Sequence, residues 1–221
     1  MKIAIWNVNS IKARLEHVKK WLSDSQVDVL MIQELKGEAF PSEAFEALGY
    51  IAVVSSQKAY NGVATLIKKD LTGLDFEVMA ERLPGDESDK QARFLDCKIN
   101  GVRCVNIYLP NGNPVDSEKY PYKLSWMKRL YSYMETLRGA ESDVLVALTF
   151  IWGIRMHSAL KMSKISNIVF GIINAALIRK IMVFVLIIFY SRQTWLTVWK
   201  AASLMPRRAL WKHHRIMFRW F

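Results

Sequence analysis

The stretch FLDCKINGVRCVNIY, residues 94–108, carries the strongest local structural signal in the chain. At its centre stands Asn100-Gly101, a pair that suits a type I′ hairpin turn because both central positions of that turn need positive φ. The turn predicts two antiparallel strands with Cys97 opposite Cys104. We expect these cysteines to be small core residues of a reducing compartment, and a cross-strand redox pair is the alternative.

Strands and helices alternate around this hairpin in residues 1–148. Apolar runs predict the strands, and apolar residues at helical spacing predict the helices. Because strands dominate, we expect an α/β fold: a two-layer β-sandwich with antiparallel or mixed sheets, flanked by helices. The other predicted strands are Lys2–Trp6, Val27–Ile32, Ile51–Val54, Val63–Ile67, Phe76–Ala80 and one that begins at Val144, and the predicted helices begin after a capping Ser10, cover Glu43–Leu48 with Ser42 as cap, and run from Leu124 to Leu137.

The charge of the chain divides near residue 148. The whole chain has a net charge of +11 and is 52% hydrophobic, which excludes a disordered polymer and would by itself suggest nucleic-acid binding. Residues 1–148, however, carry 19 of the 31 Lys and Arg together with all 20 Asp and Glu, whereas residues 149–221 carry 12 basic residues and no acid. The basicity therefore belongs to residues 149–221 alone.

Residues 149–221, called the tail below, have three competing interpretations. A membrane anchor is disfavoured because Arg179 and Lys180 divide its uncharged runs, and each cation costs about 3 kcal/mol at the centre of a spanning helix. A nucleic-acid-binding arm is disfavoured because residues 181–190 (IMVFVLIIFY) are strongly apolar. We favour out-of-frame or otherwise unselected sequence, which accounts for both the missing acids and the abrupt boundary.

Several residues that could carry chemistry stand just beyond predicted strands. Asn7 and Asn9 follow the first strand, Glu34 follows the second, and Tyr108 and Asn111 come at and after the end of the hairpin. Such groups can converge at one rim of a sheet, where carboxylate and amide oxygens could hold a divalent metal for phosphodiester hydrolysis. Taken singly, each also has a structural interpretation: a turn asparagine, a solvated acid or a core tyrosine.

These candidates lie within distinctive short motifs, which occur in a fixed order. The motifs are WNVNSIKAR at residues 6–14, MIQELK at 31–36, YNGVA at 60–64, and ARF at 92–94 followed by NIYLPNG at 106–112.

In this order the motifs resemble those of exonuclease III and the related AP endonucleases, within the endonuclease/exonuclease/phosphatase superfamily. The resemblance identifies residues 1–148 as the N-terminal part of such a phosphodiesterase domain, with a DNase I-like fold. Residues 149–221 form a basic, apolar tail without it.

The resemblance implies a role for each candidate residue. Glu34 would ligate Mg²⁺ or Mn²⁺ with Asn7 beside it, and Tyr108 would act at the scissile phosphate. Asn9 and Asn111 would line the site and contact the substrate. The implied activity is that of a DNA-repair nuclease, an AP endonuclease and 3′→5′ exodeoxyribonuclease acting on duplex DNA with abasic sites or 3′ ends. No protein partner is implied.

The sequence also departs from the family pattern. The family motif Gly-Asp-x-Asn, which supplies a water-activating aspartate, is missing after the strand that begins at Val144, and so is the closing Ser-Asp-His motif. We therefore expect a truncated or frameshifted chain that is weakly active or inactive, with its C-terminal half missing or replaced. The alternatives are an inactive remnant, a membrane-tethered protein and a hydrolase of another phosphodiester. Because no signal peptide opens the chain, we expect it in the cytoplasm.

Overall fold

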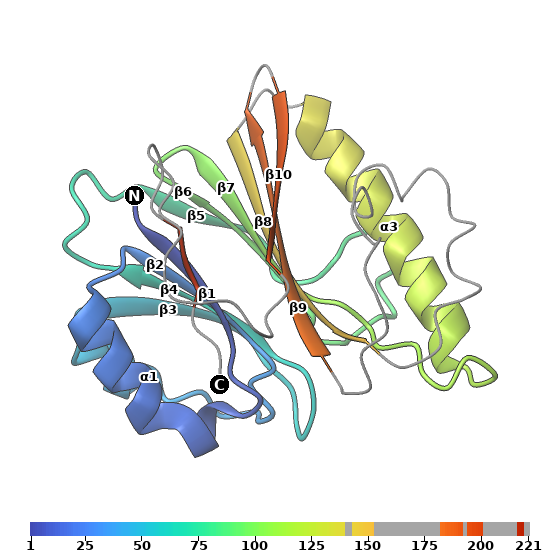
Figure 1. The fold of residues 1–221 in the computed structure, drawn as a ribbon, viewed down its shortest axis with the longest axis horizontal. Helices are drawn as coiled ribbons and strands as arrows, with labels where there is room; N and C mark the ends of the chain where they lie inside the picture. The colour runs from blue at the N-terminus through green and yellow to red at the C-terminus, as the bar shows by residue number, and fades with distance from the viewer. Residues whose placement is uncertain (140–142, 153–181, 192–193, 201–215, 219–221) are drawn as a thin grey trace.

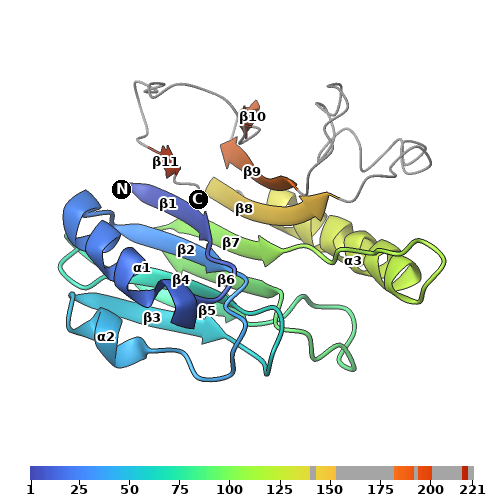
Figure 2. The same cartoon turned by 60° about the horizontal axis from the view of Figure 1, so that its bottom comes forward.

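The computed structural model describes residues 1–139, 143–152, 182–191, 194–200 and 216–218. Two β-sheets pack face to face, and helices lie on the outer faces of the pair (Figure 1 and Figure 2). The expected α/β sandwich is confirmed, with both sheets of mixed strand direction.

The first sheet contains the four N-terminal strands and β11, in the order β11-β1-β2-β4-β3. β1 and β2 are parallel and are connected by α1, while β4 is antiparallel to both of its neighbours. The helix α1 packs on the outer face of this sheet (Figure 2). The bounds are Ile3–Asn7 for β1, Ile11–Ser25 for α1, Val29–Gln33 for β2, Ser42–Glu46 for α2, Tyr50–Ser55 for β3, Val63–Lys68 for β4 and Ile216–Phe218 for β11.

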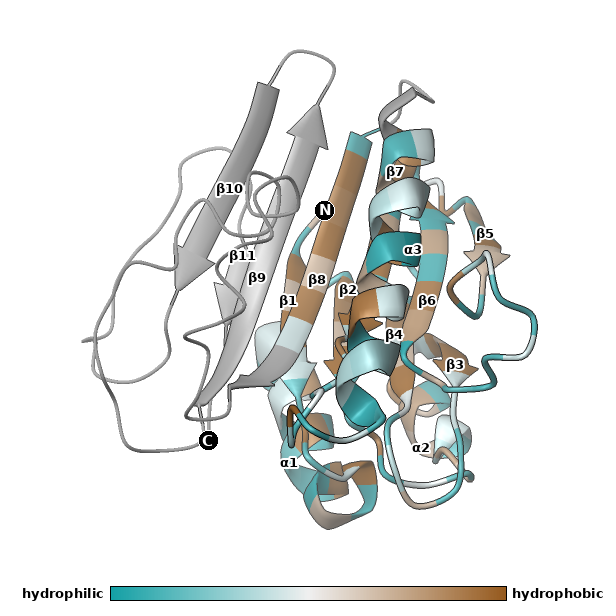
Figure 3. Ribbon diagram, turned by 90° about the vertical axis from the view of Figure 1, so that its right-hand side faces the viewer, coloured by the Kyte–Doolittle hydropathy of each residue, from teal (hydrophilic) through white to brown (hydrophobic). Residues whose placement is uncertain are grey.

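The second sheet has the order β10-β9-β8-β7-β6-β5. β7 and β8 are parallel and are connected by α3, which lies along the outer face of this sheet (Figure 3). The remaining pairs are antiparallel. The bounds are Phe76–Ala80 for β5, Phe94–Ile99 for β6, Val102–Tyr108 for β7, Lys119–Gly139 for α3, Asp143–Trp152 for β8, Met182–Ser191 for β9 and Thr194–Lys200 for β10.

The hairpin at Asn100-Gly101 has the predicted turn and register. Both residues have positive φ, 47° and 82°, and Cys97 pairs with Cys104 across β6 and β7. Both thiols are free and buried, and burial raises the pKa of Cys97 to about 12. A thiol held protonated in this way is a poor nucleophile, which supports the prediction that the pair fills the core.

The two predicted helix caps have different outcomes. The Ser10 hydroxyl accepts a hydrogen bond from the backbone N–H of Ala13, so Ser10 caps α1 as predicted. The prediction for Ser42 is wrong, because α2 begins at Ser42 itself and its N-cap is Pro41, which has no side-chain acceptor. The helix therefore starts one residue earlier than its apolar positions suggested.

Three hydrophobic clusters hold the layers together. The first lies between the two sheets and includes Met31 of β2 and Leu145 of β8. The second joins the first sheet to α1, where the rings of Trp6 and Trp21 meet edge to face at 5.6 Å. The third joins the second sheet to α3 and includes Trp126. Because side chains alternate along a strand, β1, β2, β6 and β8 each supply the inter-sheet cluster with every second residue.

Regular structure continues past the boundary expected at residue 148. β8 runs on to Trp152, β9 and β10 extend the second sheet, and β11 pairs with β1. The tail therefore contributes strands to both sheets, because β9 and β10 are rich in β-branched and aromatic residues that favour strands. How the tail side chains pack lies outside the described residues. Within the described ranges, no helix is both long and apolar enough to cross a membrane.

Candidate active site

Strands from both sheets reach one rim of the sandwich, called the site rim below. β1 ends at Asn7 and the parallel β2 ends one residue before Glu34. β7 ends at Tyr108, which is paired in register with Thr149 of β8. The Asn7 side-chain amide donates a hydrogen bond to the Thr149 hydroxyl at 3.5 Å, so the two sheets meet at this rim.

A buried bridge of amide groups holds the end of β2 against the second sheet. The Asn106 side-chain amide of β7 donates to the carbonyls of Ile32 at 3.1 Å and Ala64 at 2.9 Å. Its own oxygen accepts from Gln33 Nε2 at 2.7 Å. Both Asn106 and Gln33 are fully buried, so these bonds fix the relation of β2 to β7 one residue before the site.

Glu34 is the acid at the centre of the site rim. It is only 6% exposed and has a positive φ of 63°. The hydroxyl of Tyr108 donates a hydrogen bond to its carboxylate. Burial and then the charge of Glu34 raise the pKa of Tyr108 to about 12, against an opposing effect of Arg93. Tyr108 therefore remains a protonated donor at neutral pH.

Asn7 and Asn9 are connected to Glu34 by hydrogen bonds and by the side chain of Lys36. The oxygen of the Asn7 side chain accepts from the backbone N–H of Asn9 at 3.1 Å. The Asn9 side-chain oxygen in turn accepts from Lys36 Nζ, which also lies 3.0 Å from Glu34 Oε1. Asn7 and Asn9 are thus linked to Glu34 through Lys36, and Tyr108 is the further partner of Glu34.

The contacts of Asn111 are with the loop before α3 and with α3 itself. Its side-chain oxygen accepts from Asn113 at 2.8 Å, and its carbonyl accepts from Lys123 Nζ of α3 at 3.2 Å. These contacts fix Asn111 within the loop that precedes α3. A substrate-binding role for Asn111 stays a prediction.

Arg93 is a site-rim residue to which the sequence gave no role beyond its place in a motif. Its guanidinium lies 5.2 Å from the centre of the Tyr108 ring, and it donates to the Tyr108 carbonyl at 3.4 Å. Burial lowers the pKa of Arg93, whereas Tyr122, Tyr108 and Asp89 oppose that shift. Its Nε is buried and has no hydrogen-bond partner among the described residues. The positive charge of Arg93 therefore lies against the ring of Tyr108.

Thr149 is the β8 residue that meets the site rim, and the expected Gly-Asp-x-Asn motif is absent from this strand. It is fully buried, its hydroxyl meets Asn7, and its carbonyl accepts from the backbone N–H of Leu109 at 3.0 Å. A threonine hydroxyl is not ionised at neutral pH and cannot serve as a carboxylate does. Sequence reasoning did not single out Thr149, although its place next to Tyr108 across β7 and β8 follows from the pairing of these strands.

The donors at the site rim fit a hard divalent cation in kind. Such ions take oxygen ligands from carboxylates and amides, and Glu34, Asn7 and Asn9 supply them. In the described part of the chain, however, no group of three or more His, Cys, Asp or Glu residues could together hold a metal. The site therefore offers one carboxylate, supported by amides.

Comparisons with known proteins match the first two thirds of the chain. Exodeoxyribonuclease III of Haemophilus influenzae is 31% identical over 153 residues, which are 66% of this chain and 55% of that protein. The structure of a 3′-5′ exonuclease (NExo) from Neisseria meningitidis matches with 34% identity and a TM-score of 0.60, covering 67% of this chain and 57% of that one. An AP endonuclease from Archaeoglobus fulgidus matches with 36% identity and a TM-score of 0.55, covering 66% and 55%.

The matched part of the chain is the part that contains the motifs. The chain spans about half the length of the curated relative it matches. The model of the endonuclease/exonuclease/phosphatase family matches residues 4–147, which include Asn7, Glu34, Tyr108 and the Asn106 bridge. This match covers more than half of the chain and ends just before Thr149. The chain therefore belongs to the endonuclease/exonuclease/phosphatase family.

Proposed function

We propose that the chain is a DNA-repair nuclease of exonuclease III type that keeps one side of its active site and has strongly reduced activity. The substrate would be duplex DNA with abasic sites or 3′ ends, cleaved with Mg²⁺ or Mn²⁺. One observation carries this proposal: the buried carboxylate of Glu34 accepts a hydrogen bond from Tyr108 at the rim where both sheets end. The names of the relatives, an exodeoxyribonuclease III and an AP endonuclease, support DNA as the substrate.

Glu34, with the amide oxygens of Asn7 and Asn9, would hold the metal. A bound divalent cation would neutralise charge on the phosphate that is attacked. Tyr108 would donate its hydroxyl proton in a hydrogen bond to a phosphate oxygen, since its raised pKa of about 12 keeps it protonated at neutral pH. Arg93, against the ring of Tyr108, would orient that ring and add positive charge near the phosphate.

A surface loop beside Glu34 supports contact with DNA. Gly62 and Asn61 accept hydrogen bonds through their carbonyls from the backbone N–H groups of Leu35 and Lys36, so the loop that ends at Gly62 lies against the Glu34 segment. Tyr60 in this loop is 70% exposed, which is unusual for a large aromatic residue. Exposed aromatic rings offer stacking or groove contacts to nucleic acid, while Lys and Arg bind the phosphates.

The reduction in activity follows from the missing Gly-Asp-x-Asn motif. A positioned general base contributes about 10²–10⁴-fold to a hydrolytic rate, and the hydroxyl of Thr149, where β8 meets Asn7, cannot take up a proton at neutral pH. The single carboxylate also makes a weak site for Mg²⁺, which binds through several oxygen ligands. Both effects lower the rate, and they act on the same step.

The test is cleavage of a labelled duplex that contains one abasic site. With Mg²⁺, the purified full-length chain should cleave at less than about a thousandth of the rate of exodeoxyribonuclease III of Haemophilus influenzae, within the range for a lost general base. Glu34→Ala and EDTA should each remove the remaining cleavage. Cleavage that survives both treatments would contradict the assignment of Glu34, and a rate close to that of the relative would contradict the proposed loss of activity.

A further inference from the structure

We propose that the ammonium group of Lys36 is a built-in counter-ion of Glu34, and that a divalent cation has to displace it in order to bind. The inference rests on the proposed metal-dependent function and deepens it. It concerns the same two oxygen donors, a carboxylate and an amide, that the metal would need.

The position of the ammonium group carries the proposal. Lys36 Nζ lies 3.0 Å from Glu34 Oε1 and donates a hydrogen bond to the side-chain oxygen of Asn9. A cation that bridges a carboxylate oxygen and an amide oxygen occupies the place that a hard metal ion would take. Lys36 and a divalent cation therefore compete for the same ligands.

The backbone turns Lys36 back toward Glu34. Both residues have positive φ, 63° for Glu34 and 54° for Lys36. The N–H groups of Leu35 and Lys36 are fixed by the carbonyls of Gly62 and Asn61 at 3.2 and 2.9 Å. At Gly62 a Cβ atom would come within 2.8 Å of the Leu35 side chain, so the two segments are in close contact. The lysine is thus held over the acid by local structure.

Burial explains why Glu34 needs such a partner. Its side chain is only 8% exposed, and a carboxylate removed from water is costly unless a positive charge or hydrogen bonds compensate it. Lys36 supplies the charge, and Tyr108 supplies a hydrogen bond. The Lys36 side chain is 36% exposed, so it can move into water when another cation arrives. Arg93 faces the ring of Tyr108 and its carbonyl.

The experiment measures Mn²⁺ binding to the full-length chain, by electron paramagnetic resonance of the free ion. Lys36→Gln should bind Mn²⁺ about fivefold more tightly than the unmodified chain, the size expected when a partly buried ion pair no longer competes. Lys36→Arg, which keeps the charge, should stay close to the unmodified chain. An unchanged or weaker affinity in Lys36→Gln would overturn the proposal.

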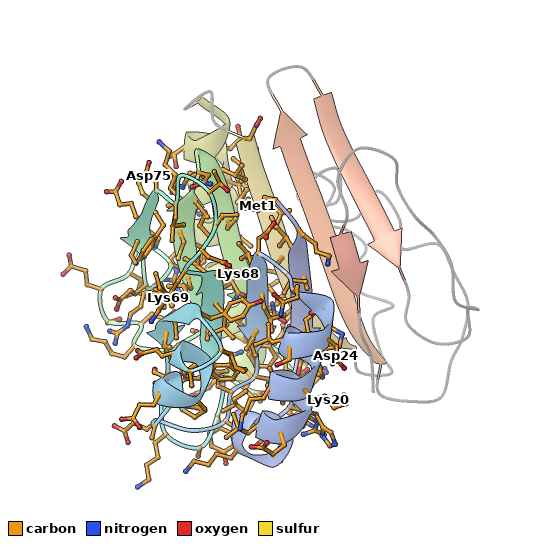
Figure 4. All side chains as sticks on the ribbon, turned by 90° about the vertical axis from the view of Figure 1, so that its left-hand side faces the viewer. Met1, Lys20, Asp24, Lys68, Lys69 and Asp75 are labelled. Atoms are coloured by element: carbon orange, nitrogen blue, oxygen red, sulfur yellow. The ribbon has the colours of Figure 1, made fainter. Side chains whose placement is uncertain are left out.

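A matched control separates local competition from the general loss of a positive charge. Lys20 forms an ion pair with Asp24 on the exposed side of α1, also at 3.0 Å, and both residues lie far from the inter-sheet core (Figure 4). Lys20→Gln removes the same charge and should leave Mn²⁺ affinity unchanged. If Lys20→Gln tightens binding as much as Lys36→Gln does, the effect is a general one and the proposal is wrong.

Glu34→Gln distinguishes this inference from the proposed function. If Glu34 is the metal ligand, Glu34→Gln should lose most Mn²⁺ binding. Binding that is unchanged in Glu34→Gln would contradict the metal site itself. Binding that falls in Glu34→Gln but does not rise in Lys36→Gln would contradict only the competition by Lys36. Far-ultraviolet circular dichroism of each variant establishes that it is folded, and the charge-conserving Lys36→Arg provides a second comparison at the same position.

Discussion

Strands β2 and β8 reach the site rim from opposite sheets, and both are buried where they face the inter-sheet core. β2 is followed by Glu34, which accepts from Tyr108 and pairs with Lys36. β8 carries Thr149 at the site rim, where its hydroxyl accepts a long hydrogen bond from Asn7. The two strands therefore have equivalent places in the core but different chemistry at their ends.

Strand formation and active-site chemistry therefore depend on different residues. A strand forms and pairs because its apolar and β-branched residues are buried against the opposite sheet. A change of one residue at the rim has little effect on that burial. Chemistry depends on single groups at the rim. The fold can therefore keep its layers on both sides while its active site is complete on only one of them.

The largest expected effect tests whether the two strands are packed equally well. Met31 of β2 and Leu145 of β8 are 0% and 2% exposed and share the inter-sheet cluster. Met31→Ala and Leu145→Ala should each lower the free energy of unfolding by about 2–5 kcal/mol, because each leaves a cavity. Urea unfolding followed by tryptophan fluorescence measures both. A loss at Leu145 that is negligible beside the loss at Met31 would break the comparison, since β8 would then not be docked.

The second prediction concerns the amide bridge beneath Glu34. Asn106→Leu would remove its hydrogen bonds to the carbonyls of Ile32 and Ala64 and from the amide of Gln33. Buried groups left unpaired cost about 1–3 kcal/mol, so the free energy of unfolding should fall by that amount. Asn113→Leu, in the exposed loop before α3, is the control and should change stability little. Equal stability of Asn106→Leu and the unmodified chain would mean that the bridge does not hold β2 in place.

Sequence reasoning located most of the framework for identifiable reasons. The described strands from β1 to β8 begin and end within about two residues of the predicted ones where both ends were predicted, because apolar runs and the Asn100-Gly101 turn are local signals. The resemblance supplied the grouping of Asn7, Glu34 and Tyr108. The sequence did not reveal the contacts that need the assembled fold, such as those of Lys36 with Asn9 and of Arg93 with Tyr108.

The strands of the tail have a physical explanation as well. The missing acids and the abrupt charge boundary are features of composition, whereas strand pairing depends on β propensity and on an available edge. β8 offered such an edge, and the apolar run that became β9 pairs with it from Val144 to Trp152. A composition that looks unselected can therefore still extend a sheet. This leaves open to experiment whether the β8 end contributes anything to the site.

The smallest expected effect tests that end directly. Thr149→Val keeps the shape of the side chain and removes the hydroxyl that meets Asn7 at 3.5 Å. A hydrogen bond of that length is weak, and the half-buried Asn7 amide can turn to water, so the free energy of unfolding should change by less than about 1 kcal/mol. The residual cleavage of abasic duplex should equal that of the unmodified chain, because the hydroxyl is not ionised at neutral pH. Loss of the residual cleavage in Thr149→Val, with stability retained, would show that β8 contributes chemistry after all and that the two strand ends differ in degree rather than in kind.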